Sequence, residues 1–281
     1  MSKVIYTLLC FLGIVGLLNL SYSIDNHFEP GRLIASRNDT DVPSSEFKEL
    51  LKKMIIFSKS QSSGRRILLK SIKKPKEFWN LFGAFAPEVY CPIKVRIGKL
   101  GDGGKWTCNP WRIPENSYIL SLGLNNQIDF EQELQTLLNN TCIIHGYDRD
   151  EQNNTTKQIY KKLRGTTHKA TIGNQTTIKS LAKRENIDSF EILKIDIEGA
   201  EHDALIPFLE DMSVCQIYIE IHGDAPKHSK LLQKIAHLSY RLFSYEVNGY
   251  EISAVEYSFI HENCIEKYGG YRIANYLDFL S

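Results

Sequence analysis

The 281-residue sequence has little excess charge of either sign. It contains 34 Lys and Arg residues against 33 Asp and Glu residues, and the basic residues form no long uninterrupted tract. Because binding to a phosphate backbone needs clustered positive charge, this composition argues against a nucleic-acid partner. Cysteine is also scarce, with six residues and no pair in the C-x-x-C spacing of a zinc site. The sequence therefore indicates no metal ligand set.

Long hydrophobic runs are rare as well, and the one that stands out lies at the N-terminus. Val4 to Leu20 carries no charge and follows the short positive start Met1 to Lys3. Its length lies between a signal-peptide core and the roughly 17 to 25 residues of a membrane span. Small residues at Ser21 and Ser23 favour cleavage after Ser23, and a signal anchor stays open. We predict a protein of the secretory pathway, secreted or in the Golgi or endoplasmic reticulum lumen, that contacts membrane only through this segment if it is uncleaved.

Two further features fit passage through an oxidising lumen. Five N-x-S/T sequons offer glycosylation sites, although such short motifs also arise by chance; they lie at Asn38, Asn139, Asn153, Asn154 and Asn174. Disulfides are expected there too, and Cys91 with Cys108, on either side of a Gly-rich loop, is the first choice. Cys142 and Cys215 lie in apolar runs and are candidates for buried free thiols.

The order of polar and apolar segments divides the chain into three parts. Residues 1–23 form the signal peptide or anchor, residues 24–87 a stem and helical N-terminal region, and residues 88–281 the main domain. Within the second part, the 3–4 spacing of apolar residues predicts an amphipathic helix over Glu46 to Phe57. A polar gap is expected from Gly64 to Lys76.

From Tyr118 onward, short apolar runs alternate with helical stretches, which is typical of a parallel sheet with crossover helices. The expected strands are Tyr118–Gly123, Cys142–Tyr147, a weaker one near Lys169–Ile172, Phe190–Ile195 and Cys215–Ile221, and the expected helices are Phe130–Leu138, Ile178–Arg184 and Ser229–Leu238. Asn248-Gly249 between Tyr240–Val247 and Ile252–Ile260 predicts a hairpin. The fold class is therefore α/β, Rossmann-like and mostly parallel, with a C-terminal antiparallel hairpin and a helical N-terminal region before it.

In such sheets ligands bind beyond the carboxyl ends of the strands. The first strand ends in a turn that contains Gly123 and Asn125, two residue types that tolerate the backbone of a turn beneath a ligand. Asp148 follows the second strand, where Rossmann-like proteins place an acid on ribose hydroxyls. Two interpretations stay open for Asp148, because an acid in a polar loop beside Arg149 needs no ligand.

Acidic residues crowd the end of the fourth strand. Asp196, Glu198 and Glu201 lie within six residues, which is more than capping of the following helix requires. Glu220 and His222 end the fifth strand. A histidine titrates near neutral pH and can take a proton from a substrate hydroxyl, although a lone histidine is more often structural.

Three segments carry a family resemblance. KIDIEGAEHDAL, from Lys194 to Leu205, resembles the signature of FkbM-type methyltransferases, and Glu220-Ile221-His222 is similar to that family as well. The loop Gly98 to Cys108, with GDGGKW-x-C, resembles the related methyltransferase-like secretory proteins of animals. The resemblance extends from about Cys91 to Tyr268, and it implies a class I methyltransferase sheet, whose last strand is inserted antiparallel, and S-adenosyl-L-methionine as cofactor.

The strand-end positions and the resemblance together predict residue roles. The predicted cofactor-binding residues are Gly123, Asn125, Asp148, Asp102 and Lys105, and the predicted catalytic residues are His222, Asp196, Glu198 and Glu220. The expected reaction is methyl transfer to an oxygen of a carbohydrate or small metabolite.

Two alternatives stay open. A lumenal glycosyltransferase would use Asp196-x-Glu198 as an acidic pair for a metal. A catalytically inactive secreted protein would fit the loss of glycines at Asn125 and Gln127 and the unusual His145-Gly146.

Overall fold

The structure is a computed structural model that describes residues 44–173 and 176–279. The N-terminal hydrophobic segment, most of the predicted stem, and the sequons at Asn38 and Asn174 lie outside the described residues. Glu49–Ser281 forms one compact unit. Within the described ranges, every helix is too short or too polar to cross a membrane.

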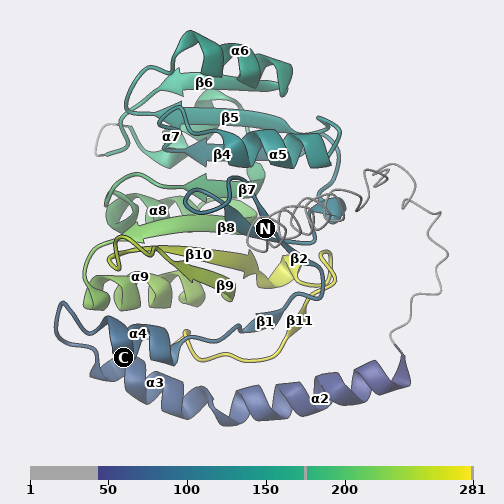
Figure 1. Ribbon diagram of the computed structural model, residues 1–281, viewed down its shortest axis with the longest axis vertical. Helices are drawn as coiled ribbons and strands as arrows, with labels where there is room; N and C mark the ends of the chain where they lie inside the picture. The colour runs from purple at the N-terminus through teal and green to yellow at the C-terminus, as the bar shows by residue number, and fades with distance from the viewer. Residues whose placement is uncertain (1–43, 174–175, 280–281) are drawn as a thin grey trace, which may run out of the picture. The chain divides into compact units, whose positions relative to one another are not determined.

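A seven-stranded sheet forms the centre of this unit, in the order β6-β5-β4-β7-β8-β10-β9 (Figure 1). Its strands are β4 (Tyr118–Leu122), β5 (Ile143–Asp148), β6 (Gly165–Lys169), β7 (Ser189–Ile195), β8 (Ser213–His222), β9 (Tyr240–Val247) and β10 (Ala254–His261). The first five are parallel, and β10 lies antiparallel between β8 and β9. The predicted class I sheet, with its last strand inserted antiparallel, is confirmed.

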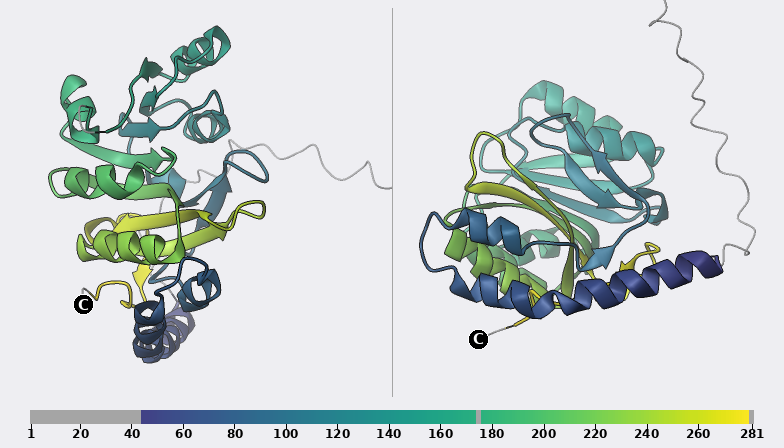
Figure 2. Two further views of the ribbon diagram at one scale, coloured as in Figure 1. Left: turned by 90° about the vertical axis from the view of Figure 1, so that its left-hand side faces the viewer. Right: turned by 60° about the horizontal axis from the view of Figure 1, so that its bottom comes forward.

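Helices cover both faces of the sheet, so the unit has three layers (Figure 2). Helices α7 (Ile178–Arg184), α8 (Glu201–Leu209) and α9 (Ala225–His237) pack in the larger apolar core on one face. Helices α5 (Asp129–Leu137) and α6 (Asn154–Lys162) pack in the second core on the other face. The central strands bury both faces, which explains their near-continuous apolar sequences.

The N-terminal region is more helical than its sequence predicts. The expected first helix is present as α2 (Ser45–Ser60), but α3 (Ser62–Ser71) replaces part of the predicted polar gap. A third helix, α4 (Phe78–Ala84), follows. Leu69 of α3 and Leu81 of α4 are buried in the larger core. Tertiary packing of a few apolar residues therefore stabilises a helix that its basic composition hides.

Two differences concern the edge of the sheet. The third strand is β6, four residues before the predicted Lys169–Ile172, because an edge strand does not need the apolar run that the prediction followed. Helix α6 was not predicted; it begins after Asn153, whose side chain accepts a hydrogen bond from the Thr156 backbone N–H. This capping residue was the sequence signal for the helix.

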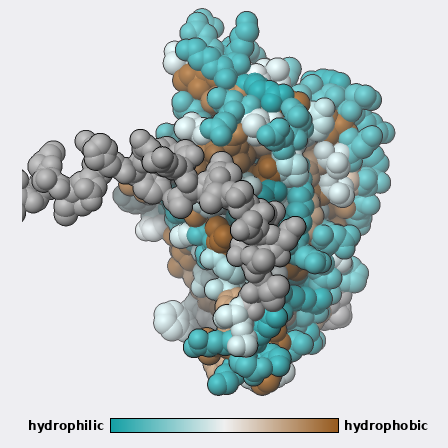
Figure 3. Space-filling view, turned by 90° about the vertical axis from the view of Figure 1, so that its right-hand side faces the viewer, coloured by the Kyte–Doolittle hydropathy of each residue, from teal (hydrophilic) through white to brown (hydrophobic). Residues whose placement is uncertain are grey.

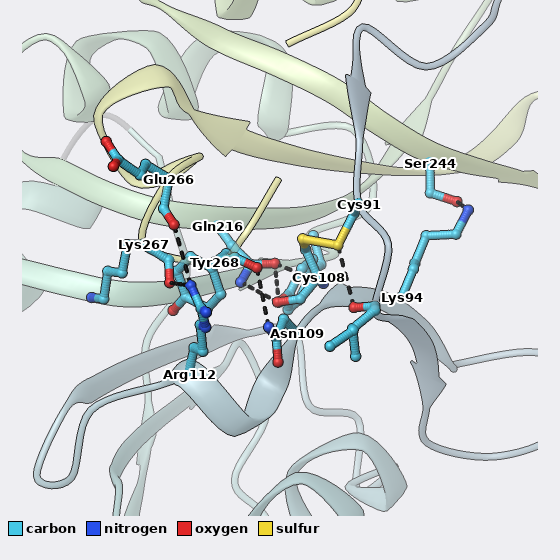
Figure 4. Close-up of a disulfide and its surroundings, with 12 residues drawn as sticks. Cys91, Lys94, Cys108, Asn109, Arg112, Gln216, Ser244, Glu266, Lys267 and Tyr268 are labelled. Carbon is cyan, nitrogen blue, oxygen red and sulfur yellow. Dashed lines mark hydrogen bonds between the residues drawn. A yellow bond between two sulfur atoms is a disulfide. The ribbon is translucent and has the colours of Figure 1, made fainter. Parts of the chain in front are cut away.

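A small β-hairpin packs on the second core, formed by β2 (Lys94–Ile97) and β3 (Lys105–Cys108). The predicted Cys91–Cys108 disulfide closes it, and Gln216 of β8 bonds both backbone groups of Cys108 (Figure 4). The short pair β1 (Val89–Tyr90) and β11 (Tyr271–Arg272) lies apart from the main sheet.

The cysteine prediction was right for one thiol and wrong for another. Cys142 is free and buried, as expected. Cys215 is not a free thiol, because it forms a disulfide with Cys264 in the short 3-10 helix η2 (Glu262–Cys264). The apolar run around Cys215 hid this pairing, since only the fold brings the start of β8 beside η2.

The surface seen in Figure 3 is mostly hydrophilic where described residues form it, with apolar residues in small groups. Scattered apolar surface residues of this kind are ordinary in folded proteins.

Candidate active site

A cavity of about 490 Å³ opens at the carboxyl ends of β4, β5, β7 and β8. The strand order reverses between β4 and β7, so this is the position at which open α/β sheets bind ligands. The volume lies within the usual range of small-molecule sites. All nine residues predicted for the site line this cavity. Seven of them come from strand ends or from the turns that follow them, and Asp102 and Lys105 do not.

The turn after β4 explains why Gly123 is a glycine. Its φ is 82°, and a Cβ there would collide with the backbone carbonyl of Asp196. Asn125 and Asn126 continue the turn with φ of 45° and 57°, which asparagine tolerates better than most residues. Asn125 therefore takes over a conformation for which glycine is the default residue, and Gln127 is not among the described residues with positive φ, so the loss of these two glycines does not disrupt the turn.

Asp148 is buried and fixed at the end of β5. Its Oδ2 accepts a hydrogen bond from the Asn125 N–H at 2.7 Å, and its Oδ1 accepts one from the Asp150 N–H at 2.8 Å. The carboxylate thus connects the turn after β4 to the loop after β5. Each oxygen keeps a further lone pair for a ligand hydroxyl, so the geometry accommodates both the anchoring role and the ribose role.

A buried polar group supports the turn from below. Lys194 Nζ donates to the Gly123 carbonyl at 3.3 Å and lies 3.6 Å from Glu131, which is fully buried. Ser121 also donates to Glu131. Sequence reasoning missed this group, because the charged members are 63 residues apart and each looked like an ordinary surface residue.

Four carboxylates surround His222 at the end of β8. Its Nε2 lies 4.0 Å from Asp196, 3.7 Å from Glu198 and 3.9 Å from Glu220, and its Nδ1 lies 3.4 Å from Glu201. The structure therefore brings together all four residues predicted as catalytic. Glu201 is fully buried at the start of α8, and its Oε1 also accepts the Ile197 N–H at 2.9 Å.

These neighbours change the protonation of the site. The hydrogen bond to Glu201 raises the pKa of His222 to about 9, against the opposing effect of burial. Burial, together with Glu256 and Asp196, raises the pKa of Glu220. Near neutral pH His222 is therefore mainly an imidazolium, and its neutral form becomes populated as the pH rises.

Lys105 lies on β3 with only 2% of its surface exposed and pairs with Glu256 of β10. Burial by itself lowers the pKa of Lys105, but the carboxylate of Glu256 outweighs it and the pKa is raised. Asp196 and Glu220 also raise the pKa of Lys105, by a smaller amount than Glu256 does. Lys105 therefore belongs to the His222 end of the cavity. Asp102 lies in the Gly-rich loop before β3 and lines the same cavity.

The residues present fit a polar, partly cationic cofactor. Oδ1 of Asp196 is enclosed and accepts no hydrogen bond from any described residue. Gly123 and the two asparagines bring backbone close to the cavity, as binding of an adenosyl group requires. Asp196, Glu220 and His222 also offer ligand atoms within 4.8 Å of one another, so this end of the cavity has donors suited to a divalent cation.

A second group of titratable side chains lies outside this cavity's acidic end. His145 of β5 is 3.3 Å from Glu185 at the end of α7, and His168 of β6 is 3.8 Å from the same carboxylate. Burial lowers the pKa of His145, and His168 lowers it further, whereas Glu185 raises it. The unusual His145 of the sequence is thus part of a cluster.

Three solved structures show weak similarity to the chain. A tRNA methyltransferase from Bacillus subtilis is 11% identical with a TM-score of 0.35, covering 54% of this chain and 63% of that one. A SAM-dependent methyltransferase from Streptococcus mutans is 10% identical with a TM-score of 0.38, covering 63% and 56%. Aeropyrum pernix fibrillarin in complex with S-adenosyl-L-methionine is 9% identical with a TM-score of 0.34, covering 61% and 84%. The chain therefore spans less than two thirds of the first two proteins, and TM-scores this low carry no argument about function.

No curated protein matches the chain. A family model described as a methyltransferase domain matches residues 38–261. This match includes the strands β4 to β10, the cavity at their ends and every residue predicted for the site. The chain therefore belongs to this methyltransferase-domain family, with the class I sheet and S-adenosylmethionine as cofactor.

Proposed function

We propose that this protein transfers a methyl group to a hydroxyl oxygen, with His222 as the base that accepts the hydroxyl proton. One observation carries the proposal. The His222 imidazole lines the cavity at the end of β8, and the carboxylate of the buried Glu201 contacts its Nδ1. Glu201 accepts from Nδ1–H, which leaves Nε2 directed towards the other three carboxylates and the acceptor.

Glu201 acts through His222 and is therefore a positioning residue. Because its carboxylate stabilises the imidazolium, it makes proton uptake by His222 favourable once the neutral imidazole has formed. Asp196 and Glu198 lie within 4.0 Å of His222 Nε2, and their negative charges stabilise the imidazolium. Proton transfer to such a base contributes about 10²- to 10⁴-fold to a rate.

The other end of the cavity holds the cofactor. Bound S-adenosylmethionine supplies a methyl group made electrophilic by the positive sulfur. Gly123 and Asn125 provide close backbone, Asp148 provides carboxylate oxygens for the ribose hydroxyls, and Asp102 lies at the rim. The chain's main contribution is to hold donor and acceptor in line.

The charge of the acceptor end favours a hydroxyl compound without phosphate. Asp196, Glu198 and Glu251 line the cavity there, against the imidazolium of His222 and Lys105, which is already paired with Glu256. An anionic acceptor would be repelled by this group of carboxylates. A carbohydrate or small metabolite is therefore the proposed acceptor class, and a nucleic acid is disfavoured.

The secretory pathway is the proposed location. The apolar N-terminal run and the two disulfides, Cys91–Cys108 and Cys215–Cys264, support an oxidising compartment. Asn139, Asn153 and Asn154 are exposed, as glycosylation requires. The resemblance to FkbM-type enzymes supports the finer family assignment.

Calorimetric titration of the full-length chain tests the cofactor assignment. The ligands are S-adenosylmethionine, S-adenosylhomocysteine, and a nucleotide sugar with Mn²⁺. Binding of both adenosyl compounds and not of the nucleotide sugar is expected. If the folded chain binds neither adenosyl compound, an inactive protein is the better description; if it binds only the nucleotide sugar, the glycosyltransferase alternative holds.

A variant and its matched control then test the role of Asp148 in cofactor binding. Asp148→Asn should weaken S-adenosylmethionine binding about 10-fold, because a buried oxygen loses its charge at the ribose. Asp188→Asn is the matched control, since Asp188 is exposed and does not line the cavity. If both variants bind S-adenosylmethionine with equal affinity, Asp148 has no role in binding the cofactor.

A further inference from the structure

Three metal-ligating side chains converge at the edge of the sheet, in a cluster distinct from the His222 group. His145, His168 and Glu185 place one ligand atom each within 4.8 Å of one another. Nδ1 of His145 lies 3.3 Å from Oε2 of Glu185, and Nε2 of His168 lies 3.8 Å from Oε1. None of these residues has a part in the proposed methyl transfer.

Strand register explains the convergence. In the parallel pair β5–β6, Tyr147 is opposite His168 and His145 is opposite Thr166. His145 and Tyr147 are two residues apart on one strand, so they lie on the same face of the sheet as each other. The Tyr147 and His168 rings stack with centroids 5.1 Å apart. The side chain of Glu185, at the end of α7, lies against His145 and His168 on this face.

One of the three side chains is already oriented as ligands are in metal sites. The Tyr147 hydroxyl donates to Oε1 of Glu185 at 2.6 Å, and this type of outer hydrogen bond fixes a carboxylate ligand. His145 is 8% exposed, and its Nδ1 lies 3.3 Å from the Thr166 hydroxyl, a contact that zinc bound at Nδ1 would replace.

The third side chain, His168, has a ring nitrogen without a hydrogen bond. Nε2 of His168 is enclosed and makes no hydrogen bond with any described residue. Buried polar atoms are nearly always paired, so an unpaired imidazole nitrogen beside a carboxylate and a second imidazole calls for a ligand. A polar network without metal satisfies Glu185 and His145 but leaves this nitrogen unexplained.

We propose that His145, His168 and Glu185 bind one Zn²⁺ ion. Two imidazoles and one carboxylate form a set that zinc binds tetrahedrally, with a water as the fourth ligand. Bonds of about 2.0–2.2 Å place tetrahedral ligands roughly 3.3–3.5 Å apart. The His145–Glu185 separation of 3.3 Å meets this requirement. His168 lies 3.8 Å from the other oxygen of the same carboxylate, and the three ligand atoms lie within 4.8 Å of one another, so zinc binding has to draw His168 closer. The ion ties the edge strand β6 to β5 and α7.

The site has a connection to the cofactor cavity. Tyr147 lines the cavity, and so do residues 170–172, which follow His168 and Lys169 at the end of β6. Zinc therefore stabilises the strand from which one wall of the cavity continues. Its role is structural, because the ligands belong to the sheet edge and not to the acidic end of the cavity.

Zinc titration of the full-length chain tests the proposal. The protein is stripped with a chelator and titrated with ZnCl₂ in competition with a chromophoric chelator. The variants are His168→Gln and Glu185→Gln. The matched controls are His237→Gln, an exposed histidine that also faces a carboxylate, and His222→Gln in the other ligand group.

One zinc equivalent is expected in the wild type and in both controls. Loss of a ligand should weaken its affinity by more than the roughly 10- to 100-fold that outer hydrogen-bonding partners contribute. The proposal is wrong if the wild type binds no zinc, if His168→Gln binds it as tightly as the wild type, or if only His222→Gln loses it.

A measurement on the wild type alone covers the case in which a variant misfolds. Zinc should protect the partly exposed His168 from modification by diethyl pyrocarbonate, because coordination of Nε2 leaves the other ring nitrogen protonated and unreactive, whereas His237 stays reactive. Peptide mass spectrometry reads both sites in one sample. Equal modification of His168 with and without zinc would overturn the proposal.

Discussion

His222 and His145 are both held by a glutamate, yet their surroundings move them in opposite directions. His222 has four carboxylates within 4.0 Å, and its pKa is raised to about 9 by the bond to Glu201. His145 has one carboxylate and a second histidine beside it, and burial lowers its pKa. The first imidazole is suited to take up a proton and the second to remain neutral.

The comparison teaches that an acid hydrogen-bonded to a histidine can outweigh the effect of burial, whereas an acid that is only nearby does not. Excess negative charge stabilises imidazolium, which is useful where a proton has to be accepted. A neighbouring imidazole and a low-dielectric setting favour the neutral ring, which is the form that metals bind. Four tests can break or sharpen this division of roles.

The largest effect should follow from replacing each histidine in turn. His222→Gln should lower kcat about 10²- to 10⁴-fold with little change in S-adenosylmethionine affinity, because a glutamine cannot accept the proton. His145→Gln should leave kcat within a few-fold. The measurement is radiolabelled methyl transfer to an acceptor identified from a panel of sugars. An equal loss in both variants would contradict the division.

Zinc should stabilise the fold through one cluster and not the other. At 100 times its dissociation constant, a bound ion adds about 2.7 kcal/mol to the free energy of unfolding. This gain is expected in the wild type and in His222→Gln, and it should be absent in His168→Gln. Urea unfolding with and without zinc measures it. A gain that survives in His168→Gln would place the ion elsewhere.

The pH dependence of kcat should follow Glu201. If neutral His222 is the base, kcat rises as the pH passes its raised pKa, with a midpoint near 9. Glu201→Gln removes the largest cause of the increase, so the midpoint should move towards 6.5. Glu185→Gln is the control and should leave the midpoint in place. An unchanged midpoint in Glu201→Gln would show that another group titrates.

The smallest effect concerns stability against pH. Because the folded pKa of His222 is raised, its stabilisation is complete below about 6.5 and is lost as the pH approaches 9. The folded pKa of His145 is lowered, so protonation of this imidazole destabilises the fold as the pH falls below about 6.5. His222→Gln should therefore flatten the alkaline side of the stability profile and His145→Gln the acid side. Parallel profiles in urea unfolding would refute the assigned directions.

Much of the fold could be predicted from the sequence, and the exceptions share a cause. Ile178–Arg184 matched α7, and Tyr240–Val247 matched β9. These segments carry a clear local period or lie next to a strong turn signal. The polar strand β6 and the basic helix α3 were misplaced or missed, because their structure depends on neighbours that pairing and packing supply.

The site shows the same pattern. The predicted catalytic residues lie at the ends of two parallel strands: Asp196 and Glu198 follow β7, and Glu220 and His222 end β8. The rule that ligands bind beyond these strand ends predicted that the four side chains would meet. Glu131 and Glu256 lacked such a signal, because each is placed by packing from another element. Glu201 was seen as one of several acids near a helix start, and only the geometry distinguishes it as the partner of His222.

The sequence by itself determined the alternation of strands and helices, the left-handed turn at Gly123 to Asn126 and the acidic character of the strand ends, because these depend on local backbone preference and side-chain chemistry. Only the tertiary structure decided which acid holds which histidine, and that Cys215 pairs with Cys264. Charge states and ligand sets depend on distances across strands and helices, and those distances arise only when the chain packs.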